Sequence, residues 1–398
     1  MKKKENSKRS NIAYLVSHPI QYQSPMLKYI SEKLEADLEV LFLSNMSVKG
    51  YRDIEFDYDI KWDTPLLSGF HYKFLRALGP QKNSFLFPIC LDIYSILKHS
   101  EYDYLWVHGW GSLTNILAII FANKLGIKVL IRGESNLLLP KGSQLKQKIK
   151  SLFLRWLFKK IDYYLAIGSL NKQFYEFYGV DKNRIIMVPY AVDNHYFQQQ
   201  SKESRTRMAE FKKSNKIADG SKVILYASKL TNRKNSIDLL LAYEQLLNSF
   251  SENMPYLFFV GSGEMSISLS KLIEQKKLNK VRILGFKNQS QLPDYFECCD
   301  IFVLPSSAEP WGLVVNEVMN HSKPIIVSDE VGCAVDLVED GVNGFIFKCG
   351  DIDDLSKKIK ILLIDDEMHL MASSNSLRKI NSWGFEADLI GFKKILFG

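Results

Sequence analysis

Short apolar runs, rich in β-branched and aromatic residues, alternate along the chain with longer segments of helical periodicity. We expect strands at residues 12–17, 38–43, 102–108, 127–132, 163–167 and 185–189 in the first half, and at 223–227, 256–260, 281–284, 301–304 and 324–328 in the second. Because these runs are almost continuously apolar, they are typical of parallel strands that helices cover on both faces. The alternation predicts an α/β protein with two doubly wound domains.

A polar stretch around residues 193–221 separates the two halves, and residues 198–205 contain no hydrophobic side chain. We therefore expect an N-terminal Rossmann-like domain over residues 1–195 and a C-terminal one over residues 196–375. A C-terminal helix at 376–398 is expected to return to the first domain. Two such domains would face each other across a cleft lined by the carboxyl ends of both sheets, where open α/β sheets bind ligands.

Residues 304–317 carry the clearest candidate chemistry. A buried strand ends near Pro305, a loop carries Glu309, and a helix begins near Gly312. Free backbone N–H groups at a helix start favour an anion, and Gly312 lets a phosphate approach the backbone. Glu309 in the loop and Glu317 on the helix can then flank a bound phosphate. By itself the pair is also compatible with two solvated glutamates.

Further motifs surround this segment in a fixed order. They are residues 226–234 with Lys229 and Lys234, a Val-Gly-x-Gly loop at 260–263, a turn at 284–286, and the stretches 323–329 and 338–345. Together with the Glu-x7-Glu spacing, they resemble the retaining glycosyltransferases of family 4, which have the GT-B fold. The resemblance is dense over residues 221–356 and looser in the first half. It implies that the domain over residues 1–195 is the acceptor side and that the domain over residues 196–375 binds the nucleotide sugar. It implies transfer of a sugar from a UDP- or GDP-sugar to a glycan or lipid-linked acceptor, in cell-surface polysaccharide biosynthesis, with no metal and no separate cofactor.

The resemblance also implies roles for single residues. Lys229 and Lys234 hold the diphosphate. Family members more often have Arg at the position of Lys229; the forked contact of a guanidinium is therefore replaced in this chain by the point charge of an ammonium group. Glu309 contacts the donor sugar and Glu317 the ribose. The other donor-site residues that the resemblance implies are Gly261, Phe286, Gly312, Leu313 and Val314. Without it, the two lysines would be interpreted as a solvated loop pair.

In the first half, His108 ends a predicted strand at the place where the family carries a His near the transferred sugar. A structural histidine is the alternative. Arg132 and Glu134 replace the family's second half-motif and are expected in the cleft. The opening loop, residues 17–25, departs from the family's glycine-rich turn, and His18 and Gln21 are expected to contact acceptor or phosphate unless the turn is purely structural.

The net charge of +8 is unevenly distributed. Residues 1–200 hold 27 lysines and arginines against 18 acidic residues, whereas the remainder holds 25 against 26. Residues 141–160 contain seven basic residues, no acidic one, and apolar residues at helical spacing. Such a helix can lie on an anionic bilayer, or it can pack its apolar stripe on the first sheet while its lysines stay solvated.

Several functional classes are disfavoured. No run of apolar residues is long enough for a membrane span, and the five cysteines have no metal-type spacing. Two Asp-x-Asp sequences, at 57–59 and 351–353, are assigned to a polar loop and to a helix cap. No nucleic-acid motif occurs. We expect a cytoplasmic enzyme, peripheral to the membrane at most. A sugar-nucleotide epimerase or hydrolase and a non-catalytic nucleotide-sugar-binding protein remain as alternatives.

Overall fold

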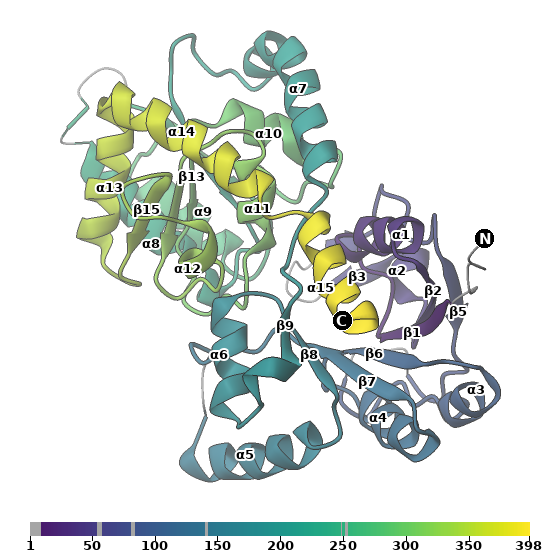
Figure 1. The fold of residues 1–398 in the computed structure, drawn as a ribbon. Coiled ribbons are helices and arrows are strands. Elements are labelled where there is room, and N and C mark those ends of the chain that lie inside the picture. Colours follow the sequence, from purple (N-terminus) through teal and green to yellow (C-terminus); the bar gives the residue numbers. More distant parts are fainter. Residues whose placement is uncertain (1–8, 54–57, 81–83, 140–141, 248, 251–253) are drawn as a thin grey trace.

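The computed structural model of the protein describes residues 9–53, 58–80, 84–139, 142–247, 249–250 and 254–398. Two parallel sheets form its two halves (Figure 1). The first has the strand order β5-β2-β1-β6-β7-β8-β9, formed by His71–Phe74, Ala36–Phe42, Ser10–Val16, Tyr104–His108, Lys128–Arg132, Tyr163–Ala166 and Ile185–Met187. The second has the order β12-β11-β10-β13-β14-β15, formed by Val281–Ile283, Tyr256–Val260, Val223–Ala227, Ile301–Leu304, Ile325–Ser328 and Gly344–Phe347.

Helices connect successive strands in both halves. Those of the first half are α1 (Gln23–Lys33), α2 (Met46–Lys49), α3 (Ile93–His99), α4 (Leu113–Leu125), α5 (Gln144–Phe158) and α6 (Ser169–Phe177). The remaining helices are α7 (Asn194–Ser214), α8 (Ser236–Leu246), α9 (Ser266–Gln275), α10 (Leu292–Cys298), α11 (Leu313–Met319), α12 (Ala334–Leu337), α13 (Ile352–Ile364), α14 (Asp366–Asn381) and α15 (Phe385–Phe397). Single 3₁₀ turns occur at η1 (Lys182–Arg184) and η2 (Asn232–Lys234).

Both sheets are buried on both faces. In β1, Leu15 belongs to one apolar cluster and Tyr14 to another, because successive side chains of a strand point to opposite faces. Leu225 and Tyr226 of β10 divide in the same way between two clusters of the second half. The predicted pair of doubly wound domains is therefore confirmed.

The predicted strands all occur, and their ends lie within two residues of the predicted ones. Three short elements were not predicted. The edge strand β5 is exposed along its whole length, and β15 is short, with only three apolar residues after Gly344. The third is a hairpin of β3 (Tyr51–Asp53) and β4 (Tyr58–Ile60), which lies outside both main sheets.

The polar stretch after residue 193 is a helix, α7, where the sequence suggested only a break between the halves. Its polar residues are satisfied by α10: Ser204 Oγ donates to Asp294 Oδ1 at 2.7 Å, and Ser201 Oγ donates to Glu297 Oε2 at 2.6 Å. Arg205 Nε pairs with Glu297 Oε1 at 2.8 Å. The middle of the helix is thus held by polar contacts, which a search for apolar periodicity does not detect.

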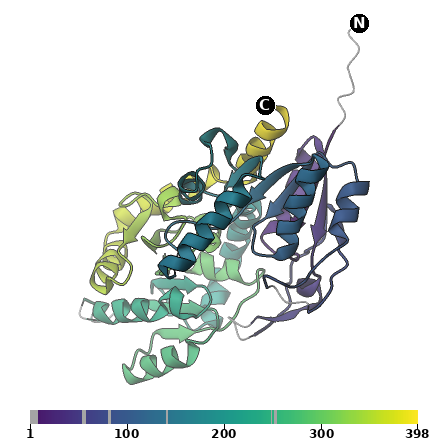
Figure 2. The ribbon, with the colours of Figure 1, turned by 90° about the horizontal axis from the view of Figure 1, so that it is seen from below.

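The C-terminal helix α15 lies against α1 and β9 of the first half (Figures 1 and 2). Its Asp388 pairs with Arg132 at 3.3 Å, and both side chains are buried. The domain limits at residues 195 and 375 stay a prediction. Within the described ranges, no helix is both long and apolar enough to cross a membrane.

Candidate active site

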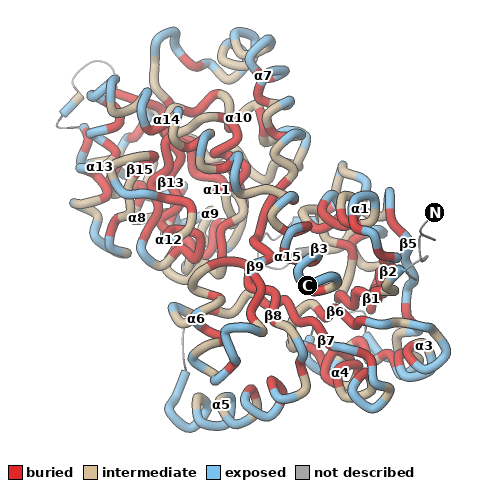
Figure 3. The backbone as a smooth tube through the Cα atoms, viewed as in Figure 1, coloured by how far each residue is buried: buried red, intermediate tan, exposed pale blue. Residues whose placement is uncertain are grey.

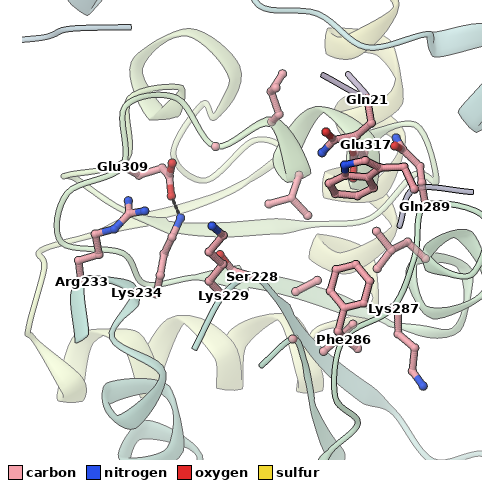
Figure 4. Close-up of a pocket in the computed structure, with 18 residues that line it drawn as sticks. Gln21, Ser228, Lys229, Arg233, Lys234, Phe286, Lys287, Gln289, Glu309 and Glu317 are labelled. Atoms are coloured by element: carbon pink, nitrogen blue, oxygen red, sulfur yellow. Dashed lines mark hydrogen bonds and ion pairs between the residues drawn. The ribbon is translucent and has the colours of Figure 1, made fainter. Parts of the chain in front are cut away.

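A cavity of about 330 Å³ lies at the carboxyl ends of β10 and β11 and beside the loop after β13 (Figure 4). Most of the predicted site residues line it, namely Gln21, Lys229, Lys234, Gly261, Phe286, Glu309, Gly312, Leu313, Val314 and Glu317. The structure thus brings together residues from the first-half loop and from four separate segments of the second half. The role of each residue stays a prediction.

Basic side chains gather at one end of this cavity. Lys229, Arg233 and Lys234 line it together, and Lys234 forms an ion pair with Glu309, in which both side chains are largely buried. The backbone N–H of Ser307 donates to the carbonyl of Arg233 at 2.8 Å, which fixes η2 against the loop that carries Glu309. Sequence reasoning did not select Arg233, although its position beside Lys234 in a basic segment was available as a signal.

Two glycines allow the backbone to form this end of the cavity. A Cβ at Gly261 would lie 1.9 Å from the carbonyl oxygen of Ser228, so no side chain fits between these two loops. Gly312 has a φ of 97° and precedes α11, whose first residues line the cavity. The helix start predicted near Gly312 is confirmed, and a substitution at either glycine would be strained.

Glu317 lies at the other end of the cavity, near Gln21 and across from Glu309 (Figure 4). Its side chain is 9% exposed, and among the described residues no hydrogen bond or ion pair reaches its carboxylate. Burial therefore raises the pKa of Glu317 to about 8. An unsatisfied buried carboxyl group that faces a cavity is suited to accept hydrogen bonds from a ligand's hydroxyl groups.

The raised pKa predicts a pH-dependent cost in stability. An unfolded Glu317 ionises near 4.5, whereas the folded one retains its proton up to about 8, so the folded state is penalised increasingly as the pH rises between these values. Glu317→Gln should raise the free energy of unfolding by roughly 2–4 kcal/mol at pH 8 and leave it nearly unchanged at pH 4.5. Thermal unfolding at both pH values measures this. Glu274→Gln, an exposed control on α9, should show no such difference, and an equal effect of Glu317→Gln at both pH values would contradict the prediction.

A second pocket, of about 380 Å³, belongs to the first half and contains His108 and His18. It is therefore separate from the cavity that holds the other predicted residues. Ile20 and Tyr22 line this pocket while Gln21 lines the first cavity, so the opening loop lies between the two. Burial, together with the nearby His108, lowers the pKa of His18 to about 4.

Glu134 is the acidic centre of this second pocket. The hydroxyl groups of Tyr190 and Tyr22 donate to its Oε1 at 2.5 and 3.2 Å, and His108 Nε2 lies 3.8 Å from the same atom. Burial would raise the pKa of Glu134, but the hydrogen bond and charge of His108 and the two tyrosine hydroxyls hold it at about 2. Glu134 is thus an ionised carboxylate beside His108 in this pocket.

The expectation that Arg132 lines the cleft is wrong. Its side chain is 2% exposed, and its guanidinium donates to the carbonyls of Val188 and Pro189 and pairs with Asp388. The side chain points into the core beneath the pocket, while Glu134, two residues further on, reaches the pocket itself. Arg132 therefore anchors α15 to the first sheet.

Of the two Asp-x-Asp sequences, the structure fully describes the one at residues 351–353. Asp351 caps α13 by accepting a hydrogen bond from the backbone N–H of Asp354 at 2.9 Å, as predicted. Asp57 of the other sequence lies outside the described residues. Within the part of the chain that the structure describes, no group of three or more His, Cys, Asp or Glu side chains is arranged to hold a metal ion.

Comparison with known families and proteins agrees with the second-half motifs. Residues 207–379 match the family described as glycosyl transferases group 1. An uncharacterized glycosyltransferase of Methanocaldococcus jannaschii is 26% identical over 136 residues, which cover 34% of this chain and 38% of that protein. The chain thus spans little more than a third of the length of this relative.

Two further similarities extend over most of the chain. The UDP-Gal:alpha-D-GlcNAc-diphosphoundecaprenol alpha-1,3-galactosyltransferase of Escherichia coli is 25% identical over 299 residues, which cover 73% of each chain. The crystal structure of HepE from Anabaena in complex with UDP superposes with a TM-score of 0.73 at 16% identity, covering 98% of this chain and 99% of that one. The fold is therefore the GT-B fold, as predicted.

Proposed function

The chain belongs to the glycosyl transferases group 1 family, and from this premise we propose that it transfers a sugar, with retention of configuration, from a nucleoside diphosphate sugar to a glycan or lipid-linked acceptor. The observation that carries the proposal is the single cavity in which Lys229, Arg233 and Lys234 face Glu309 at one end while Glu317 stands at the other.

The charged groups of the cavity fit a diphosphate. Lys229, Arg233 and Lys234 line the same cavity as Glu309, and Glu317 is largely protonated near neutral pH because its pKa is about 8. The cationic side chains can stabilise the charge that develops on a departing nucleoside diphosphate, and such charge stabilisation is often the largest contribution to catalysis. Because α11 has only seven residues, we assign this role to the side chains more than to its helix dipole.

The remaining groups can be assigned along the donor. The ribose hydroxyls bind Glu317, and the diphosphate lies against Lys229 and Lys234. The sugar is turned back toward Glu309, which accepts its hydroxyl hydrogen bonds. The departing phosphate oxygen takes the proton of the acceptor hydroxyl on the face that it leaves, so no side-chain nucleophile is needed. The acceptor enters from the first-half pocket that holds His108 and Glu134.

These cationic side chains can do the work that a divalent metal does in other transferases, so we predict metal-independent activity. Millimolar EDTA should leave the transfer rate unchanged within experimental error. The measurement is the initial rate of nucleoside diphosphate release with and without the chelator. A complete loss of activity that manganese or magnesium restores would contradict the assignment.

Helix α5 favours a membrane-associated acceptor. Its buried residues Leu154, Leu157 and Phe158 belong to the first-half core, while much of the helix is exposed (Figure 3). The exposed face also carries apolar side chains. On that face Leu145, Ile149, Leu152 and Trp156 are 69%, 60%, 72% and 44% exposed. At about 100° per residue, these four side chains fall within an arc of about 60°. The alternative was that the apolar residues of this helix pack on the first sheet. These four side chains do not, because they are exposed.

Basic residues border the exposed stripe of α5 on both sides. Lys146 and Lys150 lie on one side of it, and Lys148, Arg155 and Lys159 on the other, and all five are exposed. An apolar stripe between cationic borders suits a helix that lies in the interface of an anionic bilayer. Lys141, at the start of the predicted basic segment, lies outside the described residues. We infer that α5 docks the enzyme on anionic membrane, consistent with the lipid-linked substrate in the name of the Escherichia coli relative.

Acceptor dependence tests the proposed function. UDP- and GDP-sugars are first screened by thermal shift, because a ligand that binds only the folded state raises its stability by mass action. The donor that stabilises the protein is then incubated with and without an undecaprenyl diphosphate-linked sugar or a glycan. We expect release of the nucleoside diphosphate to require an acceptor. Equal release without one would identify a hydrolase, interconversion of the donor an epimerase, and binding without turnover a non-catalytic protein.

A further inference from the structure

The hairpin of β3 and β4 connects the two halves of the molecule. Residues 58–63, which we call the strap, comprise β4 and the three residues after it. The hairpin begins beside the first-half pocket, where Tyr51 and His18 have ring centroids 6.5 Å apart. It ends beside the donor cavity, which Trp62 of the strap lines. No family motif of the second half includes this segment.

Aromatic contacts hold the strap against the second domain. The ring of Tyr58 stacks on Phe286 with centroids 5.2 Å apart and an interplanar angle of 28°. The indole of Trp62 meets the same phenyl ring edge to face at 6.3 Å. Trp62 and Gln21 are the first-half residues among those that line the donor cavity. Phe286 is therefore shared between the cavity wall and the strap.

Polar contacts fix the backbone of the strap in the same place. Asn288 Nδ2 donates to the carbonyl oxygen of Lys61 at 2.7 Å, and the backbone N–H of Ser290 donates to the Asp63 carboxylate at 3.3 Å. The hydroxyl of Ser290 donates to the same carboxylate. These bonds bracket Trp62, so its side chain is held at the cavity from both neighbouring residues.

The end of the cavity that Trp62 lines differs in chemistry from the basic end. The ring of Phe286 provides apolar surface there, and Gln289 lies on the same side of the cavity (Figure 4). Leu292 and Val260 add apolar surface to the cavity wall. Glu317, which we assign to the ribose, lies between this end and Gln21 (Figure 4). A nucleoside diphosphate matches this arrangement: its base would meet the aromatic end, its ribose Glu317, and its diphosphate the basic end.

We propose that Trp62 contacts the nucleobase of the donor, so that the first domain completes the base site through the strap. The proposal rests on the proposed function, because it takes the cavity to hold a nucleotide. Aromatic side chains gain affinity by stacking on any base. Loss of the indole should therefore weaken nucleotide binding by about 10-fold, which is about 1.4 kcal/mol. Binding of pyrophosphate alone should not change.

Calorimetric titration of UDP, GDP and pyrophosphate into the full chain tests the proposal. Trp62→Ala should weaken the preferred nucleotide about 10-fold and leave pyrophosphate affinity unchanged, which also shows that the variant is folded. Trp62→Phe should recover most of the loss, because a ring is restored. Tyr94→Ala, which removes a partly exposed ring from α3 of the first half, is the matched control and should bind as the wild type does.

The outcomes separate this proposal from the proposed function. If the wild-type protein binds neither UDP nor GDP, the nucleotide-sugar function itself fails. If the wild type binds a nucleotide and Trp62→Ala binds it equally well, only the role of Trp62 is overturned. Equal weakening of nucleotide and pyrophosphate would also overturn it, because Trp62 would then act through the placement of the two domains and not through the base.

Discussion

Replacing Lys234 by methionine should lower kcat/KM by about 10- to 150-fold, the scale of a lost hydrogen bond to a charged group of 1.5–3 kcal/mol. Lys234 lies beside Lys229 in the donor cavity, and we assign both to the diphosphate. The same change also removes the partner of Glu309. Because that largely buried carboxylate then loses its ion-pair partner, the free energy of unfolding should fall by about 3 kcal/mol. Steady-state kinetics and chemical denaturation measure the two effects separately.

A second substitution separates stability from catalysis. Glu309→Gln, added to Lys234→Met, replaces the unpaired carboxylate by a neutral amide, so the double variant should regain much of the lost stability. Its activity should stay low, because the diphosphate still lacks Lys234 and the sugar lacks Glu309. If restoring stability also restored kcat/KM, Lys234 would be a structural residue and not part of the donor site.

Changing Lys146, Lys148, Lys150 and Arg155 to Gln should release the protein from anionic vesicles. Each basic residue near an anionic surface contributes about 1 kcal/mol, so the partition coefficient should fall by roughly two to three orders of magnitude. Wild-type binding should also weaken as salt rises, because the screening length shortens. Co-sedimentation with vesicles of phosphatidylglycerol and phosphatidylcholine, at 50 and 500 mM salt, measures both effects.

A charge-matched variant provides the control for this experiment. Lys271, Lys277, Lys357 and Lys360 are exposed on α9, α13 and the loop after α9, and their change to Gln alters the net charge equally on the second domain. This variant should sediment with vesicles as the wild type does. If the two variants lose binding equally, net charge and not α5 is responsible. If wild-type binding does not change with salt or with the content of anionic lipid, α5 is an ordinary solvated helix and not a membrane-binding one.

Much of the fold was predictable because its signal is local. Each strand of a doubly wound sheet is buried on both faces, so runs such as residues 223–227 and 301–304 are apolar throughout and stand out from their surroundings. Edge strands lack this signal, which is why β5 was missed. Helix α7 was missed for a related reason: hydrogen bonds to Asp294 and Glu297 hold it, and these partners lie about 90 residues away.

The part of the donor cavity that could be predicted consists of residues from the second-half motifs, which occur in a fixed order along the sequence. Glu309 and Glu317, with Gly312 between them, come from one strand–loop–helix segment, so the sequence places them together. Trp62 could not be found in this way, because nothing near it indicates that it meets Phe286 more than 200 residues away. Arg132 shows the opposite error: a charged residue at the end of a strand can point into the core when a partner such as Asp388 is supplied from a distant helix.

A crystal structure of the protein with the nucleoside diphosphate that stabilises it tests the donor site most directly. We expect density for the diphosphate between Lys229 and Lys234, with the ribose hydroxyls on the Glu317 carboxyl group and the base between Phe286 and Trp62. A nucleotide bound in the first-half pocket at His108 and Glu134, or one with its diphosphate at the Glu317 end of the cavity, would contradict this expectation.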